Sequence, residues 1–158
     1  MLHRRQLLGW LGAGVASGAL AACGQAEART WPVSFSDAEW KRRLTREQYY
    51  ILRQKGTEVP GTSPLLREKR KGVFVCAADG NPLFDSATKY DSRTGWPSFW
   101  EVRRGATGFS IDYDVGYPRT EVHCAKCGGH LGHVFDDGPR PTGKRYCING
   151  DALLFRPA

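Results

Sequence analysis

Near the C-terminus, one cysteine has neighbours that could turn its thiol into a nucleophile. Cys147 follows Arg145 by two residues, and His130 and His133 lie a short way upstream. The thiolate is the reactive form of cysteine, and a nearby cation lowers the thiol pKa from its free value of about 8.5. Histidine carries protons near neutral pH. These residues predict thiol chemistry; a buried, inert cysteine in a strand is the alternative interpretation.

Three further cysteines fall into two short turns. Cys124 and Cys127 form a CxxC pair followed by glycine, and Cys76 and Asp79 have the same spacing and also precede glycine. Zinc accepts thiolate sulfur and carboxylate oxygen as ligands. We therefore expect one structural zinc ion, bound by Cys76, Asp79, Cys124 and Cys127. A disulfide among the three cysteines and free thiols are the alternatives.

The first part of the chain has the features of an export signal. Two adjacent arginines precede an uncharged apolar run over residues 7–22, which is short for a membrane-spanning helix. This arrangement predicts a twin-arginine signal over residues 1–28, export to the periplasm and a functional domain over residues 29–158. Cys23 lies in a lipobox-like sequence and could carry a lipid anchor. Cleavage after Ala28 would instead release a soluble protein, and a permanent transmembrane anchor is a further alternative.

The charge of the chain is positive but does not indicate nucleic-acid binding. The formal net charge is +7, and basic clusters occur at residues 41–43 and 67–71. In an exported protein we interpret such clusters as a solvated surface. We expect a monomer of one domain with a modest core.

The order of sequence patterns predicts two short helices followed by many short strands. Ser36 and Thr45 each begin a capping-box pattern, and the second helix should end near Lys55, before Gly56. Short strands separated by Gly and Pro turns are predicted at residues 73–76, 109–113, 120–124 and 146–155. These patterns indicate a mainly β fold, a small antiparallel sandwich or open barrel with two short N-terminal helices.

Several motifs follow one another along nearly the whole domain. They are residues 44–49, 56–58, 90–92, 94–99, 130–135, 137–139 and 143–149. Their order resembles that of the methionine-R-sulfoxide reductases, the B family of these enzymes. The resemblance implies reduction of the R epimer of methionine sulfoxide, protein-bound or free, to methionine. It also implies a thioredoxin-like dithiol as the reductant and no organic cofactor.

The resemblance assigns the central steps to three residues. Cys147 would be the catalytic nucleophile that attacks the sulfoxide sulfur and becomes a sulfenic acid. Trp96 would bind the substrate by packing its ring against the methyl group. Arg145 would hold the active-site loops and favour the thiolate. Without the resemblance, Trp96 would be interpreted as a core aromatic residue beside a turn.

The resemblance assigns the oxygen of the substrate to three polar residues. His130, His133 and Asn149 would bind and polarise the sulfoxide oxygen, partly through water, so that it can accept a proton. Displacing oxygen from sulfur requires a soft nucleophile and a proton donor, and these residue types supply both.

Two positions depart from the pattern of this family. Thr94 stands where many members have a resolving cysteine, so we expect an external dithiol to attack the sulfenic acid directly. Cys23, if neither lipidated nor removed, is the alternative resolving thiol. Asp79 stands at a family cysteine position, which affects metal binding and not catalysis. Two other classes of function remain as alternatives. One is a zinc-ribbon-like binding module with an inert Cys147, and the other is a cysteine hydrolase that pairs Cys147 with a histidine.

Overall fold

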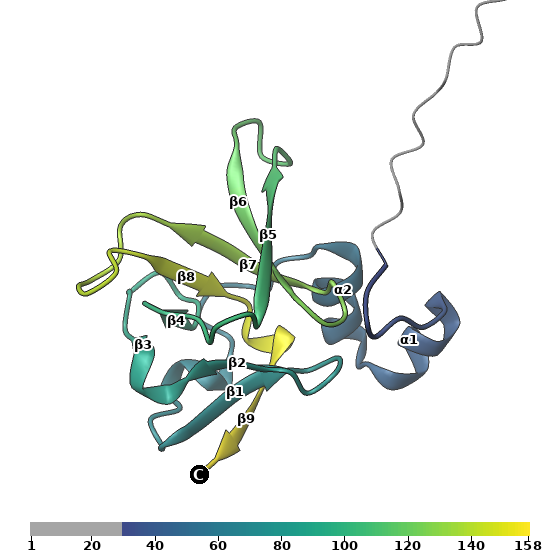
Figure 1. The fold of residues 1–158 in the computed structure, drawn as a ribbon, viewed down its shortest axis with the longest axis horizontal. Helices are drawn as coiled ribbons and strands as arrows, with labels where there is room; N and C mark the ends of the chain where they lie inside the picture. The colour runs from purple at the N-terminus through teal and green to yellow at the C-terminus, as the bar shows by residue number, and fades with distance from the viewer. Residues whose placement is uncertain (1–29) are drawn as a thin grey trace, which may run out of the picture.

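The computed structural model describes residues 30–158, which form two antiparallel sheets and two short helices (Figure 1). The helices are α1 (Asp37–Arg43) and α2 (Arg46–Gln54). The strands are β1 (Gly72–Cys76), β2 (Pro82–Asp85), β3 (Lys89–Tyr90), β4 (Ser98–Phe99), β5 (Thr107–Asp112), β6 (Arg119–Cys124), β7 (His130–Phe135), β8 (Arg145–Ile148) and β9 (Leu153–Pro157). One sheet has the order β2-β1-β9 and the other β3-β4-β8-β7-β6-β5. The expected mainly β fold with two N-terminal helices is confirmed.

The expected export signal over residues 1–28, including Cys23, lies outside the described residues. Within residues 30–158, none of the helices combines the length and the apolar character needed to span a membrane.

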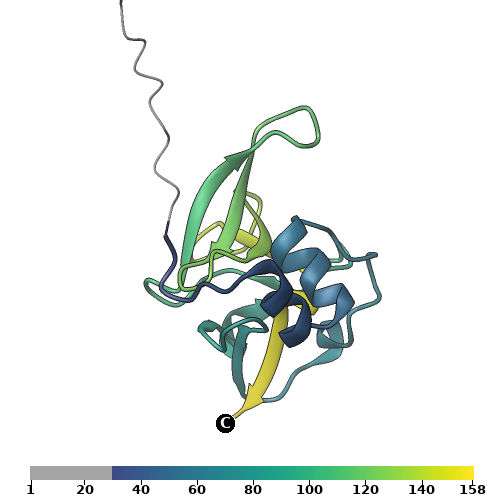
Figure 2. The ribbon, with the colours of Figure 1, turned by 90° about the vertical axis from the view of Figure 1, so that its right-hand side faces the viewer.

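The two helices begin where the capping patterns predict. The hydroxyl of Ser36 accepts a hydrogen bond from the amide of Glu39, and Thr45 and Gln48 cap each other reciprocally. α2 ends at Lys55, whose backbone is left-handed with φ 56°. The buried face of α2 packs on β7, and Figure 2 shows both helices on one side of the sheets. This packing brings the segment that follows α2 to the strands that carry the site.

Three buried phenylalanines join the two sheets. Phe84 stacks on Phe99 with ring centroids 4.3 Å apart, and Phe74 meets Phe99 edge-on at 5.0 Å. Replacing a phenylalanine in such a core by alanine costs about 3–5 kcal/mol. Because β4 pairs with β8, with Ser98 opposite Cys147, this core also fixes the position of Cys147.

The prediction of one strand over residues 146–155 was wrong. The chain leaves the larger sheet after β8, makes a short 3-10 turn at Gly150–Ala152 and joins the smaller sheet as β9. The carboxylate of Glu58 binds the backbone amides of Gly150 and Asp151 at 2.7 and 2.9 Å, which stabilises the turn. A Cβ at Gly150 would lie 1.8 Å from the hydroxyl of Ser63, so only glycine fits there.

Four strands were not among the predicted ones: β2, β3, β4 and β7. β3 and β4 have two residues each, too few for an alternating pattern to show. β7 contains Gly132, where a Cβ would lie 2.1 Å from the carbonyl oxygen of Cys147. The glycine therefore lets β7 approach β8 closely beside the cysteine.

Candidate active site and metal site

A cavity of about 120 Å³ opens beside Cys147. It is lined by Thr57, Trp96, Arg119, Gly132, His133, Phe135, Cys147 and Asn149. Four of the residues expected from the sequence therefore meet in one hollow. His130 and Arg145, which were also expected, do not line the cavity but contact His133 and Phe135, which do.

Cys147 lies on β8 between two neighbouring strands, opposite Ser98 of β4 and His133 of β7. Its Sγ atom lies 3.9 Å from the hydroxyl of Thr94. Burial raises the pKa of the thiol above its usual value, and the contacts with Thr94 and Arg145, which lower it, do not outweigh burial. Arg145 therefore favours the thiolate, as the sequence suggested, but burial has the larger effect and the net shift of the thiol pKa is upward.

Arg145 holds the hairpin formed by β7 and β8. Its guanidinium donates two hydrogen bonds of 2.8 Å each to the carboxylate of Asp137 and lies 4.4 Å from the ring centroid of Phe135. A bidentate contact of this kind fixes orientation as well as charge. This placement agrees with the expected role in holding loops, since Phe135 itself lines the cavity.

His133 is held by a buried carboxylate. Its Nε2 atom lies 2.6 Å from Asp112, and Arg119 donates to the same carboxylate oxygen at 2.7 Å. Burial alone would raise the pKa of Asp112, but hydrogen bonds from its neighbours outweigh it and lower the pKa to about 2. Burial lowers the pKa of His133, with Arg119 acting in the same direction, despite the hydrogen bond to Asp112. Asp112 is therefore ionised and His133 neutral, with its proton on Nε2 and Nδ1 left as an acceptor.

His130 is oriented by a second buried carboxylate. Its Nδ1 atom lies 2.8 Å from Glu121, which also accepts hydrogen bonds of 2.8 Å from Lys55 and Ser110. Burial would raise the pKa of Glu121, but the hydrogen bonds from His130, Lys55 and Ser110 outweigh it and hold the carboxyl pKa well below its usual range. The ring of His130 meets that of His133 edge-on with centroids 5.3 Å apart. His130 thus supports the position of His133.

Asn149 connects the cavity wall to the segment after α2. Its Oδ1 accepts a hydrogen bond of 3.0 Å from the amide of Glu58, and its Nδ2 donates to the carbonyl of Leu131 at 3.1 Å. The indole of Trp96 donates to the carbonyl of Glu58 at 3.2 Å. An asparagine amide has two N–H donors, so one remains for a ligand in the cavity.

The four expected metal ligands also meet, at the far ends of β1 and β6. The ligand atoms of Cys76, Asp79, Cys124 and Cys127 all lie within 4.8 Å of one another. The sulfurs of Cys76 and Cys127 are 3.8 Å apart, and the sulfur of Cys124 is 3.2 Å from Asp79 Oδ2. Tetrahedral Zn–S bonds of about 2.3 Å place two sulfurs about 3.8 Å apart. The cluster is therefore compatible with a structural zinc ion, and all three cysteines are free thiols.

Contacts within this cluster favour a thiolate at Cys124 and disfavour thiolates at Cys76 and Cys127. The backbone amides of Lys126 and Gly129 donate to the sulfurs of Cys124 and Cys127, both at 3.4 Å. Contacts with the other two thiols hold the pKa of Cys124 far below its usual range, while the contact with Cys124 raises the pKa values of Cys76 and Cys127. Three sulfurs this close can ionise together only beside a cation, which a metal ion supplies.

Comparison with known proteins identifies the family. The SelR domain matches residues 44–157. The peptide methionine sulfoxide reductase MsrB of Leptospira interrogans serogroup Icterohaemorrhagiae serovar Lai (strain 56601) is 56% identical over 127 residues, 80% of this chain and 97% of that protein. The chain belongs to the methionine sulfoxide reductase B family. MsrB of Agrobacterium fabrum (strain C58 / ATCC 33970) is 55% identical over 126 residues, 79% of this chain and 93% of that protein. Methionine-R-sulfoxide reductase B3, mitochondrial, of Mus musculus is 49% identical over 127 residues, 80% of this chain and 50% of that protein.

Three carboxylates that support this reductase site, Glu58, Asp112 and Glu121, were not assigned a role from the sequence. Neither were Thr57, Arg119 and Phe135, which line the cavity. Asp112 and Glu121 are buried acidic residues in β5 and β6, and both lie in strands that were predicted. Alternation along the strands could have placed them on one face. Nothing in the sequence alone indicated that the same face would carry the two histidines, because β7 was not predicted.

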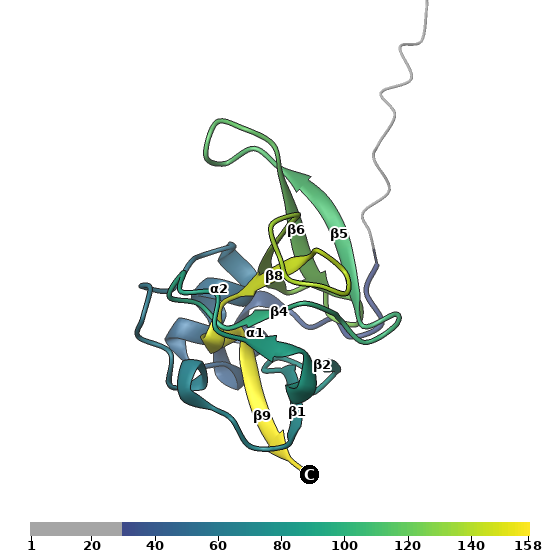
Figure 3. The same ribbon diagram turned by 90° about the vertical axis from the view of Figure 1, so that its left-hand side faces the viewer.

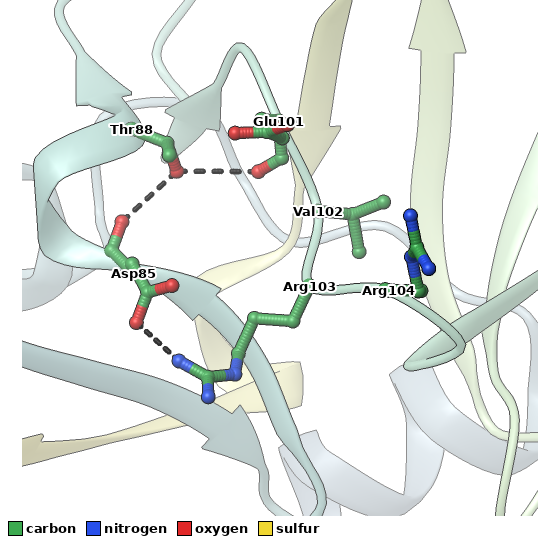
Figure 4. Close-up of a pocket in the computed structure, with 6 residues that line it drawn as sticks. All are labelled: Asp85, Thr88, Glu101, Val102, Arg103 and Arg104. Atoms are coloured by element: carbon green, nitrogen blue, oxygen red, sulfur yellow. Dashed lines mark hydrogen bonds and ion pairs between the residues drawn. The ribbon is translucent and has the colours of Figure 1, made fainter.

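A larger cavity of about 410 Å³ lies elsewhere on this member of the reductase family (Figure 4). Some of its polar groups are paired within the lining: Arg103 pairs with Asp85 at 2.5 Å, and the hydroxyl of Thr88 bonds to the backbone carbonyls of Asp85 and Glu101. Val102, Glu101 and Arg104 complete its lining, so it contains no thiol and no histidine. The smaller cavity at Cys147 is therefore the candidate active site.

Proposed function

We propose that this chain reduces the R epimer of methionine sulfoxide, protein-bound or free, to methionine. The observation that carries the proposal is the position of the Cys147 thiol in a small cavity that Trp96 and His133 also line. The aromatic ring offers an apolar wall for the methyl group, and the polar side supports a water or the sulfoxide oxygen. An inert cysteine, as in a zinc-ribbon-like module, is not favoured, because Cys147 is accessible from this cavity. A hydrolase is not favoured either, since His133 bonds to Asp112 and not to the thiol.

In the first half of the cycle, one oxygen atom passes from the sulfoxide to Cys147. The sulfur of Cys147 attacks the sulfoxide sulfur, and the proton of the thiol moves to the sulfoxide oxygen. Transfer of the resulting hydroxyl to Cys147 gives a sulfenic acid and releases methionine, so two electrons pass from the thiol to the substrate. Neutral His133 accepts a hydrogen bond at Nδ1, so it orients a water that donates to the oxygen, and the remaining N–H of Asn149 donates directly.

In the second half of the cycle, a thiol from outside the chain reduces the sulfenic acid back to the Cys147 thiol. The hydroxyl of Thr94 occupies the place beside Cys147 where a second thiol could condense with the sulfenic acid. The three other described cysteines are buried together in the metal cluster. We propose that a thioredoxin-like dithiol attacks the sulfenic acid, releasing water and forming a mixed disulfide. Its second thiol then restores Cys147.

A cysteine at position 94 should supply the missing internal thiol. Thr94→Cys, incubated with excess substrate and no reductant, should release one methionine per molecule and end with a disulfide to Cys147. Its intact mass should then be lower by two hydrogen atoms than that of the reduced protein. The unmodified chain and the Thr94→Ser control should instead gain one oxygen atom. A Thr94→Cys protein that gains oxygen and keeps both thiols apart would contradict the proposed geometry.

The epimer preference tests the proposal directly. Given racemic N-acetyl-methionine sulfoxide and dithiothreitol, the protein should consume the R epimer at least about a hundredfold faster than the S epimer. The reason is that the thiol, the ring of Trp96 and the polar groups meet the three substituents of the sulfur from fixed directions. Chiral chromatography of the remaining substrate measures the ratio. Equal consumption of both epimers would rule out the proposed reaction.

We propose that Cys76, Asp79, Cys124 and Cys127 bind one structural zinc ion. Their spacing, the sulfur–sulfur distance of 3.8 Å and the amide donors to two of the sulfurs support this assignment. Zinc at such a site contributes folding free energy and takes no part in the reaction.

We propose further that a twin-arginine signal exports the protein to the periplasm as a monomer, with a lipid at Cys23 or cleavage after Ala28. The support is the arginine pair and the apolar run of residues 7–22. The Tat route suits a protein that has already bound zinc, because it carries folded proteins. The intact mass of the mature protein from its native host distinguishes the acylated from the cleaved form.

A further inference from the structure

The described residues 30–158 concentrate their exposed apolar side chains on one hairpin. Among the nine large exposed apolar residues, five lie between residues 109 and 117. They are Phe109, Ile111, Tyr113, Val115 and Tyr117, with exposed fractions of 46%, 60%, 66%, 49% and 59%. Scattered exposed apolar residues are ordinary, whereas a cluster of this kind marks an interaction surface. Figure 1 shows the hairpin of β5 and β6 projecting from the rest of the fold.

The loop of this hairpin starts next to the wall of the candidate active site. Asp112 and Arg119 are the last paired residues of β5 and β6. Asp112 holds His133, and Arg119 lines the cavity beside Cys147. Residues 113–118 continue from this pair as a loop that bends toward the side of α2 and the segment after it (Figures 2 and 3). Thr57, in that segment, also lines the cavity.

The loop has a defined shape and little charge. The amide of Asp114 donates to Asp112 at 2.7 Å, and the amide of Gly116 donates to the carbonyl of Tyr113 at 2.9 Å. Tyr113, Val115 and Tyr117, which we call the tip surface, are therefore presented by an ordered turn. Tyrosine provides a large contact area at a low cost in side-chain entropy.

The cavity is too small to hold more of a polypeptide substrate than one side chain. A cavity of about 120 Å³ accommodates one side chain, so the rest of a polypeptide substrate must lie on the surface around its mouth. We propose that the tip surface docks an extended segment of a polypeptide substrate whose apolar side chains flank the methionine sulfoxide. This inference rests on the proposed function and names the part of the substrate that the site recognises outside the cavity.

Two other occupants fit the tip surface less well. A stable dimer buries at least about 1,200 Å² in total, more than three side chains on a narrow loop provide. Binding to an anionic lipid surface uses a basic rim around the apolar residues. The charged side chain within residues 113–118 is the acid Asp114, and Arg119 is engaged with Asp112.

The register of the sheet predicts which substrate residues reach the tip surface. Arg119 on β6 lies two strand spacings, about 10 Å, from β8 and two residues, about 7 Å, along the strand from the level of Cys147, so the two residues are about 12 Å apart. An extended chain advances about 3.3 Å per residue, so the contacts should come from residues about three to five positions from the sulfoxide.

The test compares two peptides that differ only at those positions. Each has a polar sequence and one methionine-R-sulfoxide, with either leucine or serine placed four residues before and after it. The unmodified protein should favour the leucine peptide about tenfold in kcat/KM, about 1.4 kcal/mol. In the tip variant Tyr113→Ser/Val115→Ser/Tyr117→Ser the preference should fall below about threefold, while kcat/KM for N-acetyl-methionine-R-sulfoxide stays within about twofold. The control variant Tyr50→Ser/Leu154→Ser, which removes two other exposed apolar side chains, should keep the preference.

Binding to an inactive protein separates this inference from the proposed reaction. Fluorescence anisotropy with the labelled peptides and Cys147→Ser should show the same leucine preference, and its loss when the tip substitutions are added. If the unmodified protein reduces no sulfoxide, the proposed function fails, whereas the binding comparison still decides the docking surface. An unchanged leucine preference in the tip variant overturns the inference, as does an equal loss of activity on the small substrate. So does a dimer, or binding to lipid vesicles, that disappears with the tip substitutions.

Discussion

Replacing Cys147 by serine should lower kcat/KM for N-acetyl-methionine-R-sulfoxide by at least about a thousandfold. A serine hydroxyl is a far weaker nucleophile than a thiol, and no other described thiol lies in the cavity to replace it. The substitution exchanges one small side chain for another, so the melting temperature should change by less than about 4 °C. The measurement is methionine release with dithiothreitol as the reductant. Substantial activity of the serine variant at an unchanged melting temperature would exclude Cys147 as the nucleophile.

The pH dependence of alkylation at Cys147 measures the ionisation of this thiol independently. Because burial raises the pKa of Cys147, its alkylation by iodoacetamide in the substrate-free protein should still accelerate as the pH rises past the usual thiol pKa of about 8.5. A plateau already reached at pH 7 would show a thiolate stabilised by Arg145, as the sequence suggested. Peptide mapping distinguishes Cys147 from the three clustered cysteines. The serine variant should show no labelling at position 147.

The residues expected to act on the substrate could be assigned because the family motifs that contain them are short, local stretches of sequence. Cys147, Trp96, His133 and Asn149 were assigned from motifs and line the cavity together. The residues that orient them could not, because they come from strands distant in the sequence. Asp112 and His133 are 21 positions apart, and Glu58 and Asn149 are 91 apart. Only the register of β5, β6 and β7 brings each carboxylate to its histidine.

The same distinction explains what could be predicted of the fold. Capping is decided within four residues, so the starts of both helices followed from Ser36 and Thr45. The division of residues 146–155 between two sheets depends on a carboxylate from Glu58, far away in the chain. The CxxC-type turns lie between these cases. Each turn could be recognised by itself, whereas their meeting depends on how the turn between β1 and β2 of one sheet lies against the turn between β6 and β7 of the other.

Removing one ligand from the metal cluster should destabilise the protein more than it slows the reaction. In Cys124→Ser the zinc content should fall from about one ion per chain to well below one. The melting temperature should fall by at least about 10 °C, because metal-binding free energy at such a site is folding free energy. Activity per folded molecule at a temperature below melting should stay within about threefold, since the cluster contributes nothing to the cavity beside Cys147. Elemental analysis and calorimetry of protein purified without chelators give both quantities. Cys147→Ser is the matched control and should retain the full zinc content.

Asp79→Cys tests whether the carboxylate is a ligand or only a neighbour of the cluster. Asp79 Oδ2 lies 3.2 Å from the sulfur of Cys124, and its Oδ1 is occupied by the amide of Asn81 at 2.8 Å. A fourth thiolate in this place should keep the zinc and slow its removal by a chelator, because sulfur binds zinc more strongly than a single carboxylate oxygen. Asp79→Ala should instead speed zinc removal and lower the melting temperature. If neither substitution changes zinc retention, Asp79 is not a ligand. If the unmodified protein carries no metal and lacks two of its free thiols, a disulfide occupies the cluster and the zinc assignment is wrong.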